Sequence, residues 1–236
     1  MPFSTQRKGM TMTQLHLQVA GCGDVSVQID HLIIAGWAGR NSAAVEHHIA
    51  ELEALGVRRP TQIPCFYRVA ASLLNPASSI QVPGQDSSGE TEFVLIPSEH
   101  GLLVGLGSDH TDRKVEAFDV TVSKQMCDKP IAAQAWLLDE VKGHWDQLIM
   151  RTWRSRNGER ALYQEGPVTA LLAPETLLAK LNDAADLPAG TAMFCGTQPV
   201  IGELGYGEGF EMELFDPVLD RSLRHAYSVE ALPVAE

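Results

Sequence analysis

The chain has 236 residues, 44% of them hydrophobic, and a formal net charge of −12 at pH 7. Its length and apolar content allow a sizeable buried core, so we expect one large domain or one domain with a small appendage. The acidic balance argues against nucleic acid or an anionic membrane as the partner, because both attract basic surfaces.

The sequence has no apolar run of the ~20 residues that span a bilayer, and its polar N-terminus has no hydrophobic signal core. Its cysteines form no CxxC pair, whereas structural zinc sites usually need such close pairs of ligands. We therefore predict a cytoplasmic protein with four free, buried thiols, at Cys22, Cys65, Cys127 and Cys195.

The first quarter of the chain predicts a few strands and one helix. Residues 1–13 are polar and are expected to be disordered. The segments LHLQV and VSVQI alternate with period two around a Gly-rich turn, which predicts strands. Asn41 or Ser42 then caps a helix that ends before Gly56. We interpret residues 14–59 as an N-terminal appendage.

Residues 60–236 are predicted to form the main body, and its prolines up to residue 86 indicate loops around a short helix, RVAASLL. TEFVLI and GLLVGLG are strand-like, and Asn157-Gly158 predicts a hairpin turn. A helix is expected from Pro174, followed by the strands AMFCGT and GFEMELFD and then a C-terminal tail. Strands dominate without βαβ regularity, which predicts an α+β fold.

Two carboxylates open the strand TEFVLI. Glu90 and Glu92 are two residues apart, so in a strand they project to one face about 6–7 Å apart. Like charges at this distance repel, and a hard divalent ion such as Mg²⁺ or Mn²⁺ bound between them would offset the repulsion. The alternative is a solvated strand edge, and Glu211 and Glu213 show the same spacing.

A polar cluster, SDHTDR, follows the apolar strand GLLVGLG. A residue of this cluster, at the end of an adjacent strand, could supply a third metal ligand. We predict Asp109 as this ligand, with Asp112 as the second choice. Arg113 and Lys124 supply cations for a substrate carboxylate or a developing oxyanion. A capped turn with a surface ion pair is the other interpretation.

The order GETEF, VGLGSDHTDR, SKQMC and LPAGTAMFCGTQP resembles the catalytic body of the fumarylacetoacetate hydrolase superfamily over roughly residues 60–230. It is most similar to an uncharacterised bacterial branch described as a domain of unknown function. The resemblance implies a strand-dominated, mixed β-roll of the C-terminal type of that superfamily, and usually a homodimer.

The resemblance also implies roles for single residues. Glu90, Glu92 and Asp109 match the ligands of Mg²⁺ or Mn²⁺. Arg113 and Lys124 match active-site cations, and His110 beside a ligand is a third catalytic candidate. Substrate contacts are expected from Tyr67, Thr197 and Gln198.

The chain departs from the superfamily pattern at three residues, and its interval from Asp109 to Lys124 is shorter than in familiar members. Ala70 stands where hydrolytic members have a His, Glu116 where a Gln is common, and Gln198 interrupts the usual Gly-Thr-Pro. The resemblance therefore identifies no general base. The candidates are His110, His47 and His48.

We predict a metal-dependent enzyme that acts on a small 2-oxo or 1,3-dicarbonyl acid through a stabilised enolate, as a C–C bond hydrolase or a decarboxylase. Two alternatives stay open. One is a dehydratase or isomerase for a sugar-derived acid, which needs no attacking water. The other is a catalytically silent protein that binds small acids on the same fold.

Overall fold

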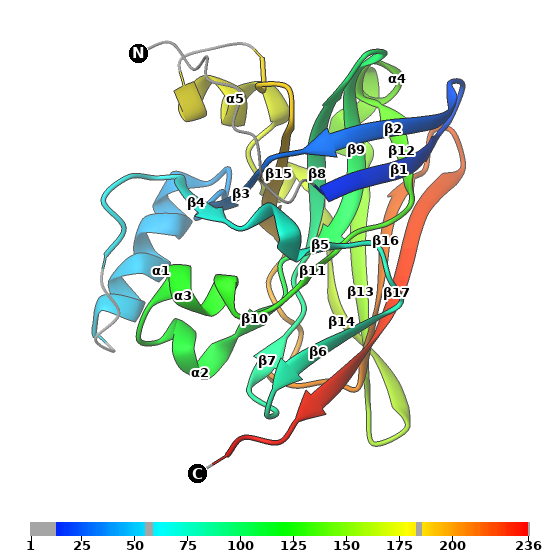
Figure 1. Ribbon diagram of the computed structural model, residues 1–236. Coiled ribbons are helices and arrows are strands. Elements are labelled where there is room, and N and C mark those ends of the chain that lie inside the picture. Colours follow the sequence, from blue (N-terminus) through cyan, green and yellow to red (C-terminus); the bar gives the residue numbers. More distant parts are fainter. Residues whose placement is uncertain (1–12, 55–58, 183–185, 236) are drawn as a thin grey trace.

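The computed structural model describes residues 13–54, 59–182 and 186–235. It is built around two packed sheets, with most of its helices at one side (Figure 1). The larger sheet has the strand order β2 (Gly23–Ile29), β1 (Thr13–Val19), β12 (Gln134–Leu137), β9 (Gly101–Ser108), β8 (Thr91–Ser98), β15 (Thr191–Thr197), β3 (His31–Gly36) and β4 (Cys65–Val69). The smaller sheet has the order β14 (Glu159–Pro167), β13 (Ile149–Arg156), β16 (Gly209–Asp216), β17 (Arg221–Leu232) and β6 (Ser79–Pro83).

Short strand pairs and helices complete the fold. The pairs are β10 (Thr111–Asp112) with β7 (Ser87–Ser88), and β11 (Lys129–Pro130) with β5 (Leu74–Asn75). The α-helices are α1 (Ser42–Ala54), α2 (Arg113–Glu116), α3 (Val120–Gln125), α4 (Leu138–Val141) and α5 (Pro174–Asn182). Single 3₁₀ segments are η1 (Ala71–Leu73), η2 (Lys142–Gln147) and η3 (Val168–Ala170). The predicted strand-dominated α+β fold is confirmed.

Strand β8 runs through the centre of the hydrophobic core and buries both of its faces. Phe93 belongs to the cluster that also contains Met150 and Phe210 of the smaller sheet. The next residue, Val94, points the other way and joins a cluster with Leu15 and Val25 of β1 and β2. Strands β1 and β2 lie in the same sheet as β8, so this sheet curls over one of its own faces.

The N-terminal strands are part of the larger sheet. β1 pairs in parallel with β12, and β3 pairs in parallel with β15. The boundary expected between an N-terminal appendage and the main body, at residues 59 and 60, stays a prediction. Strands β3 and β4 lie on either side of this boundary and pair directly with each other. Residues 1–12 of the segment expected to be disordered lie outside the described residues, while Thr13 begins β1.

Local signals in the sequence located several elements correctly. The backbone N–H groups of Ala43 and Ala44 donate to Asn41 Oδ1, at 3.1 and 3.2 Å, so Asn41 caps α1 as predicted. The hairpin of β13 and β14 turns at Asn157 and Gly158, which both have positive φ angles, 54° and 77°.

Two expectations for secondary structure are wrong. RVAASLL is not a helix, because Arg68 and Val69 pair with β3 and leave only the one-turn segment η1. The expected C-terminal tail contains β17, which joins β16 on one side and β6 on the other. Its buried Leu223, Tyr227 and Val229 complete the core between the sheets.

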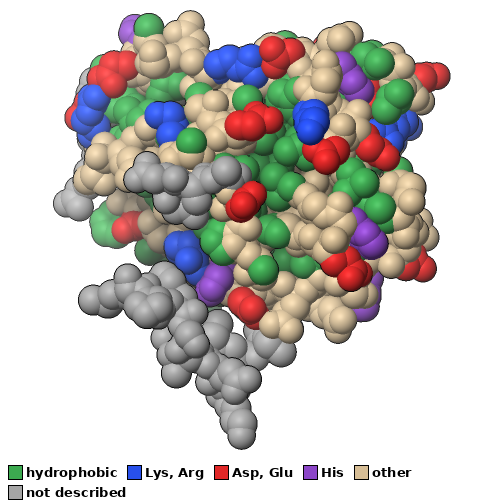
Figure 2. All heavy atoms as spheres, turned by 90° about the horizontal axis from the view of Figure 1, so that it is seen from above, with side chains coloured by type: hydrophobic (Ala, Val, Ile, Leu, Met, Phe, Trp, Pro, Cys, Tyr) green, Lys and Arg blue, Asp and Glu red, His purple; other side chains and the backbone are tan. Residues whose placement is uncertain are grey.

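The four cysteines lie among the described residues as free thiols, with Cys127 and Cys195 buried and Cys22 and Cys65 half-buried. In the described part of the chain, every helix is too short or too polar to cross a bilayer. On the face of the molecule seen in Figure 2, the described acidic and basic side chains alternate with apolar ones, without a basic patch.

Candidate metal centre and adjoining cavity

Glu90, Glu92 and Asp109 meet because β8 and β9 form an antiparallel hairpin. In this hairpin β8 begins where β9 ends, and Glu92 lies opposite Gly107. One step further out, the backbone N–H of Asp109 donates to the carbonyl oxygen of Glu90 at 2.9 Å. One carboxylate oxygen from each of the three residues lies within 4.8 Å of the others.

Burial makes this arrangement of negative charge unfavourable by itself. Glu92 and Asp109 are buried and Glu90 is half-buried. Burial, together with the neighbouring carboxylates Asp109 and Glu90, raises the pKa of Glu92 well above its usual value. Burial also raises the pKa of Glu90, although Arg113 and Lys124 oppose it.

Two buried lysines hold Asp109. The Lys124 ammonium donates to Asp109 Oδ2, and Lys129 Nζ lies 3.2 Å from Oδ1. Burial raises the pKa of Asp109, but the two lysines outweigh this and lower it to about 2. Asp109 Oδ1 accepts no hydrogen bond of good geometry from the residues that the structure describes. A buried anionic oxygen in this state, beside two further carboxylates, fits a cation ligand.

Arg113 contacts both Glu90 and Ser88, a residue of β7. Its Nε donates to Ser88 Oγ at 2.7 Å, and its terminal nitrogens lie 3.1 Å from Glu90 Oε1 and 2.8 Å from Glu116 Oε2. Burial lowers the pKa of Arg113, but Glu90 and Glu116 more than compensate and raise it. Arg113 therefore stays charged beside the carboxylates. Asp112, the reserve ligand, instead caps α2 by accepting from the N–H of Val115 at 2.8 Å.

Glu92 is oriented from β15. The N–H of Gly196 donates to Glu92 Oε2 at 2.6 Å. Gly196 has a φ angle of +96°, in the region that favours glycine, and the pairing of β15 with β8 shifts register here. This irregularity turns the amide toward the carboxylate.

The three predicted substrate-contacting residues all line one cavity with Glu90 and Glu92, but they differ in what else they bind. Tyr67 lies with its ring centroid 5.7 Å from Lys124 Nζ, and burial raises its pKa to about 12. The Thr197 hydroxyl donates to the carbonyl oxygen of Thr91 at 2.8 Å. The Gln198 amide donates to the carbonyl oxygen of Pro167 at 2.9 Å, which ties it to β14.

His110 points away from this cavity into the core. Its ring nitrogens lie 3.0 Å from the Tyr227 hydroxyl and 2.9 Å from Ser87 Oγ. Burial and the charge of Lys129 lower the pKa of His110 well below its usual value, so the ring is neutral. The catalytic role expected for His110 stays a prediction. Its contacts hold the ring between Tyr227 and Ser87, outside the cavity.

Several residues of the site have no signal in the sequence. Lys129 binds Asp109 although no spacing marks it, and Gln164 reaches the cavity from β14 and donates to Thr197 Oγ1 at 2.9 Å. Among the described histidines none lines the cavity. The helix that carries His47 contributes Ala44 and Val45, and its cap Asn41 also lines the cavity. The side chain of His48 lies outside the described residues.

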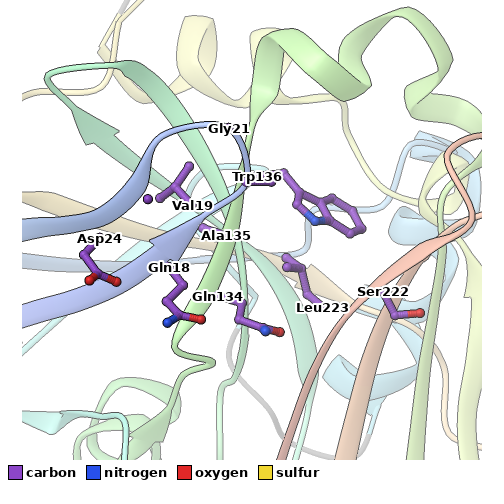
Figure 3. Close-up of a pocket in the computed structure, with 11 residues that line it drawn as sticks. Gln18, Val19, Gly21, Asp24, Gln134, Ala135, Trp136, Ser222 and Leu223 are labelled. Carbon is purple, nitrogen blue, oxygen red and sulfur yellow. The ribbon is translucent and has the colours of Figure 1, made fainter.

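The cavity has a volume of about 840 Å³, and Arg113, Glu116 and Lys124 line it beside the carboxylates. This volume is within the range of small-molecule sites, about 300–1,000 Å³. A second cavity of about 480 Å³ lies beside β1, β12 and β17, with Asp24 and Trp136 at opposite sides (Figure 3). Its lining brings no two charged groups together, so the first cavity is the better candidate.

Comparison with known proteins defines the family. Residues 35–227 match the family model described as "Protein of unknown function (DUF2848)". The chain belongs to this family. The DUF2848 match covers β4, β8, β9 and β15, so it includes the three carboxylates and their cavity. A search of curated proteins found no match.

Solved structures share the fold of this DUF2848 protein at low sequence identity. One is Cg1458, with a TM-score of 0.61 and 13% identity over 86% of this chain and 77% of that chain. Another is 2-keto-3-deoxy-D-arabinonate dehydratase complexed with magnesium and 2,5-dioxopentanoate, with a TM-score of 0.59 and 15% identity over 87% and 74%. The predicted β-roll of the fumarylacetoacetate hydrolase type is confirmed.

Proposed function

We propose that this protein is a divalent-metal-dependent enzyme that acts on a small 2-oxo or 1,3-dicarbonyl acid. One observation carries the proposal: Glu90, Glu92 and Asp109 bring oxygens within 4.8 Å of one another, and two of these residues line a cavity with Arg113 and Lys124. The magnesium complex of a dehydratase with the same fold supports the choice of cofactor.

The donor set favours Mg²⁺ or Mn²⁺, because carboxylate oxygens are the ligands that these hard ions prefer. Glu90, Glu92 and Asp109 would hold the ion. When bound, it would supply a Lewis acid that favours the enolate form of a carbonyl acid. The amide of Gly196 fixes one oxygen of Glu92 and leaves the other for coordination.

The cations of the site bind and orient the acid. Arg113 is held on both sides by Glu90 and Glu116, so its position is set before a substrate enters. Lys124 lies between Asp109 and Glu90, with its ammonium 3.8 Å from Glu90 Oε2. Both stay positively charged and favour a substrate carboxylate or a developing oxyanion in the cavity. Tyr67 and Thr197 line the same cavity.

The reaction that we propose first is C–C bond hydrolysis or decarboxylation. A dehydratase or isomerase acting on a sugar-derived acid is the second candidate, and a specific observation favours it. Ala70 stands where hydrolytic members have a His, and among the described histidines none lines the cavity to activate water. Mass analysis of products separates loss of 18 Da from cleavage into two acids or loss of CO₂.

Metal binding tests the assignment directly. We expect Mg²⁺ or Mn²⁺ to bind the wild type in calorimetry, and oxalate to bind more tightly when the metal is present. Glu92→Gln keeps the size of the side chain but removes a charged ligand, and we expect metal affinity to fall at least tenfold. The matched control is Glu211→Gln on β16, where the carboxylate binds Arg160 at 2.8 Å instead. Equal metal affinity in the two variants would contradict the proposal.

Two further expectations accompany this function. The resemblance to the superfamily implies a homodimer, and the composition of the sequence favours a cytoplasmic location; both stay predictions. Sedimentation of the full chain tests the first. A catalytically silent acid-binding protein would show metal-dependent binding of oxalate without turnover of any 2-oxo acid.

A further inference from the structure

Much of the wall of the cavity that contains the carboxylates is apolar. This part of the wall comes from the segment after β3, from α1, from α3 and from the loops around β15. The apolar side chains are Trp37, Ala38, Val45, Val120, Leu171 and Val200. A cavity that combines charged groups with an apolar wall is complementary to a ligand with a charged head and an apolar tail.

The polar residues near this wall are already hydrogen-bonded to the protein. Asn41 Oδ1 accepts from the backbone at the start of α1. The Gln164 amide donates to Thr197 Oγ1 and to the carbonyl oxygen of Gln198, and the Gln198 amide donates to Pro167. A chain that carries several hydroxyl groups would lose its water and find few replacements here.

A single residue, Gly196, lies between the apolar wall and the candidate metal ligand Glu92. A Cβ atom at Gly196 would lie 3.0 Å from Ala38 Cβ and 3.3 Å from Leu171 Cδ2. The N–H of the same glycine donates to Glu92. The apolar surface therefore starts beside Glu92, so a ligand held at the carboxylates reaches it within a few bonds.

Trp37 is held at this wall in a strained conformation. Its φ angle is 59°, in the left-handed region that bulky residues rarely adopt. The indole N–H donates to the Tyr67 hydroxyl at 3.3 Å, and Tyr67 in turn packs so closely on Gly36 that a Cβ there would lie 2.7 Å from Tyr67 Cε2. Backbone strain of this kind persists where surrounding contacts impose it, and it is concentrated at functional sites.

We propose that the site selects carbonyl acids with an apolar tail of several carbons, and that Trp37, Val45 and Val120 bind this tail. The proposal rests on the function proposed above and adds the substrate class. The acid end lies at Arg113, Lys124 and the three carboxylates, and the tail lies along the wall formed by α1, α3 and Trp37. Polyhydroxylated acids of equal length are excluded as good ligands, so this inference favours the hydrolase or decarboxylase over the second candidate, a dehydratase or isomerase of a sugar-derived acid.

A homologous series of 2-oxo acids tests the proposal. 2-Oxobutanoate, 2-oxohexanoate and 2-oxooctanoate are titrated into the full chain with saturating Mg²⁺. Two further ligands are oxalate, which tests the acid end alone, and a six-carbon 2-oxo acid that carries hydroxyl groups on its tail. Burial of each methylene is expected to raise affinity about fourfold until the cavity is filled. The hydroxylated six-carbon acid is expected to bind more weakly than 2-oxohexanoate by tenfold or more.

Two residues of α3 give a matched pair of variants. Val120 lines the cavity, whereas Val122 is 49% exposed outside it. Val120→Asn is expected to reduce the gain per methylene and to leave oxalate affinity unchanged; Val122→Asn is expected to change neither. Trp37→Asn is the second test, since Asn tolerates a positive φ angle.

The outcomes separate this inference from the proposed function. If oxalate fails to bind with Mg²⁺, the proposed function fails. If oxalate binds but the affinity of the wild type does not rise along the series, or the hydroxylated acid binds as well as 2-oxohexanoate, the tail proposal alone is overturned. An unchanged series in both Val120→Asn and Trp37→Asn would also overturn it.

Discussion

Gly107 on β9 offers a sharp test of how the fold positions the three carboxylates. A Cβ atom at this position would lie 2.6 and 2.8 Å from two ring atoms of Phe194 and 2.9 Å from the carbonyl oxygen of Pro130. Phe194 is fully buried and the carbonyl belongs to the backbone, so neither moves away easily. Overpacking of this kind costs about 1–3 kcal/mol. Gly107→Ala is therefore expected to lower the melting temperature by about 2–12 °C, at about 2–4 °C per kcal/mol for a chain of this size.

The same strand supplies the control. Gly105 is also buried and lies two residues earlier, but the nearest atoms to a Cβ there are at 3.7 Å, an ordinary contact. Gly105→Ala is expected to leave the melting temperature unchanged or to raise it slightly, because alanine has less conformational freedom in the unfolded chain. Calorimetric melting of the two variants and the wild type gives the comparison.

Gly107→Ala also has an expected effect on the site. Gly107 lies opposite Glu92 in the hairpin and two residues before Asp109. A backbone shift that relieves the contact with Phe194 would separate the carboxylates, so Mg²⁺ affinity is expected to fall in Gly107→Ala and to stay at the wild-type value in Gly105→Ala. Equal melting temperatures for the two variants would refute the packing argument.

Two further predictions concern stability away from the site. Burial raises the pKa of Glu213, but hydrogen bonds from Arg224 and Arg151 outweigh it and lower the pKa below 4.5. The charged form therefore stabilises the fold above pH 4.5, and this contribution is lost as the pH falls through the lowered value. Glu213→Gln is expected to cost about 1–3 kcal/mol at neutral pH, and urea titrations at decreasing pH should show the gap to the wild type closing; a constant gap would contradict the assignment. Gly158→Ala is expected to cost about 1–2 kcal/mol, because φ is +77° there, whereas Gly143→Ala, with ordinary φ and open space, should cost less. Equal costs in urea unfolding would show that the turn conformation is not limiting.

The candidate site was predictable where the ligands lie on neighbouring strands of one hairpin. Glu92 lies on β8 and Glu90 directly before it, and Asp109 directly follows β9, so antiparallel pairing brings the three together. The spacing of Glu211 and Glu213 is identical, yet Arg160 binds the first and Arg151 and Arg224 bind the second. Spacing within a strand therefore does not tell a metal site from a set of ion pairs.

Residues that reach the site across the fold were not predictable. Lys129, Gln164 and Trp37 come from β11, β14 and the segment after β3, and none shows a local pattern. Their positions depend on which strands pair at long range. The tail strand β17 is a similar case, because its parallel pairing with β6 joins residues about 150 positions apart.

The sequence by itself determined those features that a few neighbouring residues decide. The Asn41 cap and the turn at Asn157 and Gly158 follow from local backbone conformation, and the closeness of Glu90 and Glu92 follows from their separation by two residues. Only the tertiary structure decided that β1 and β3 join the main sheet and that an apolar wall adjoins the carboxylates. Parallel pairings and cavity walls are stabilised by contacts between distant segments, and no local periodicity encodes which segments will meet.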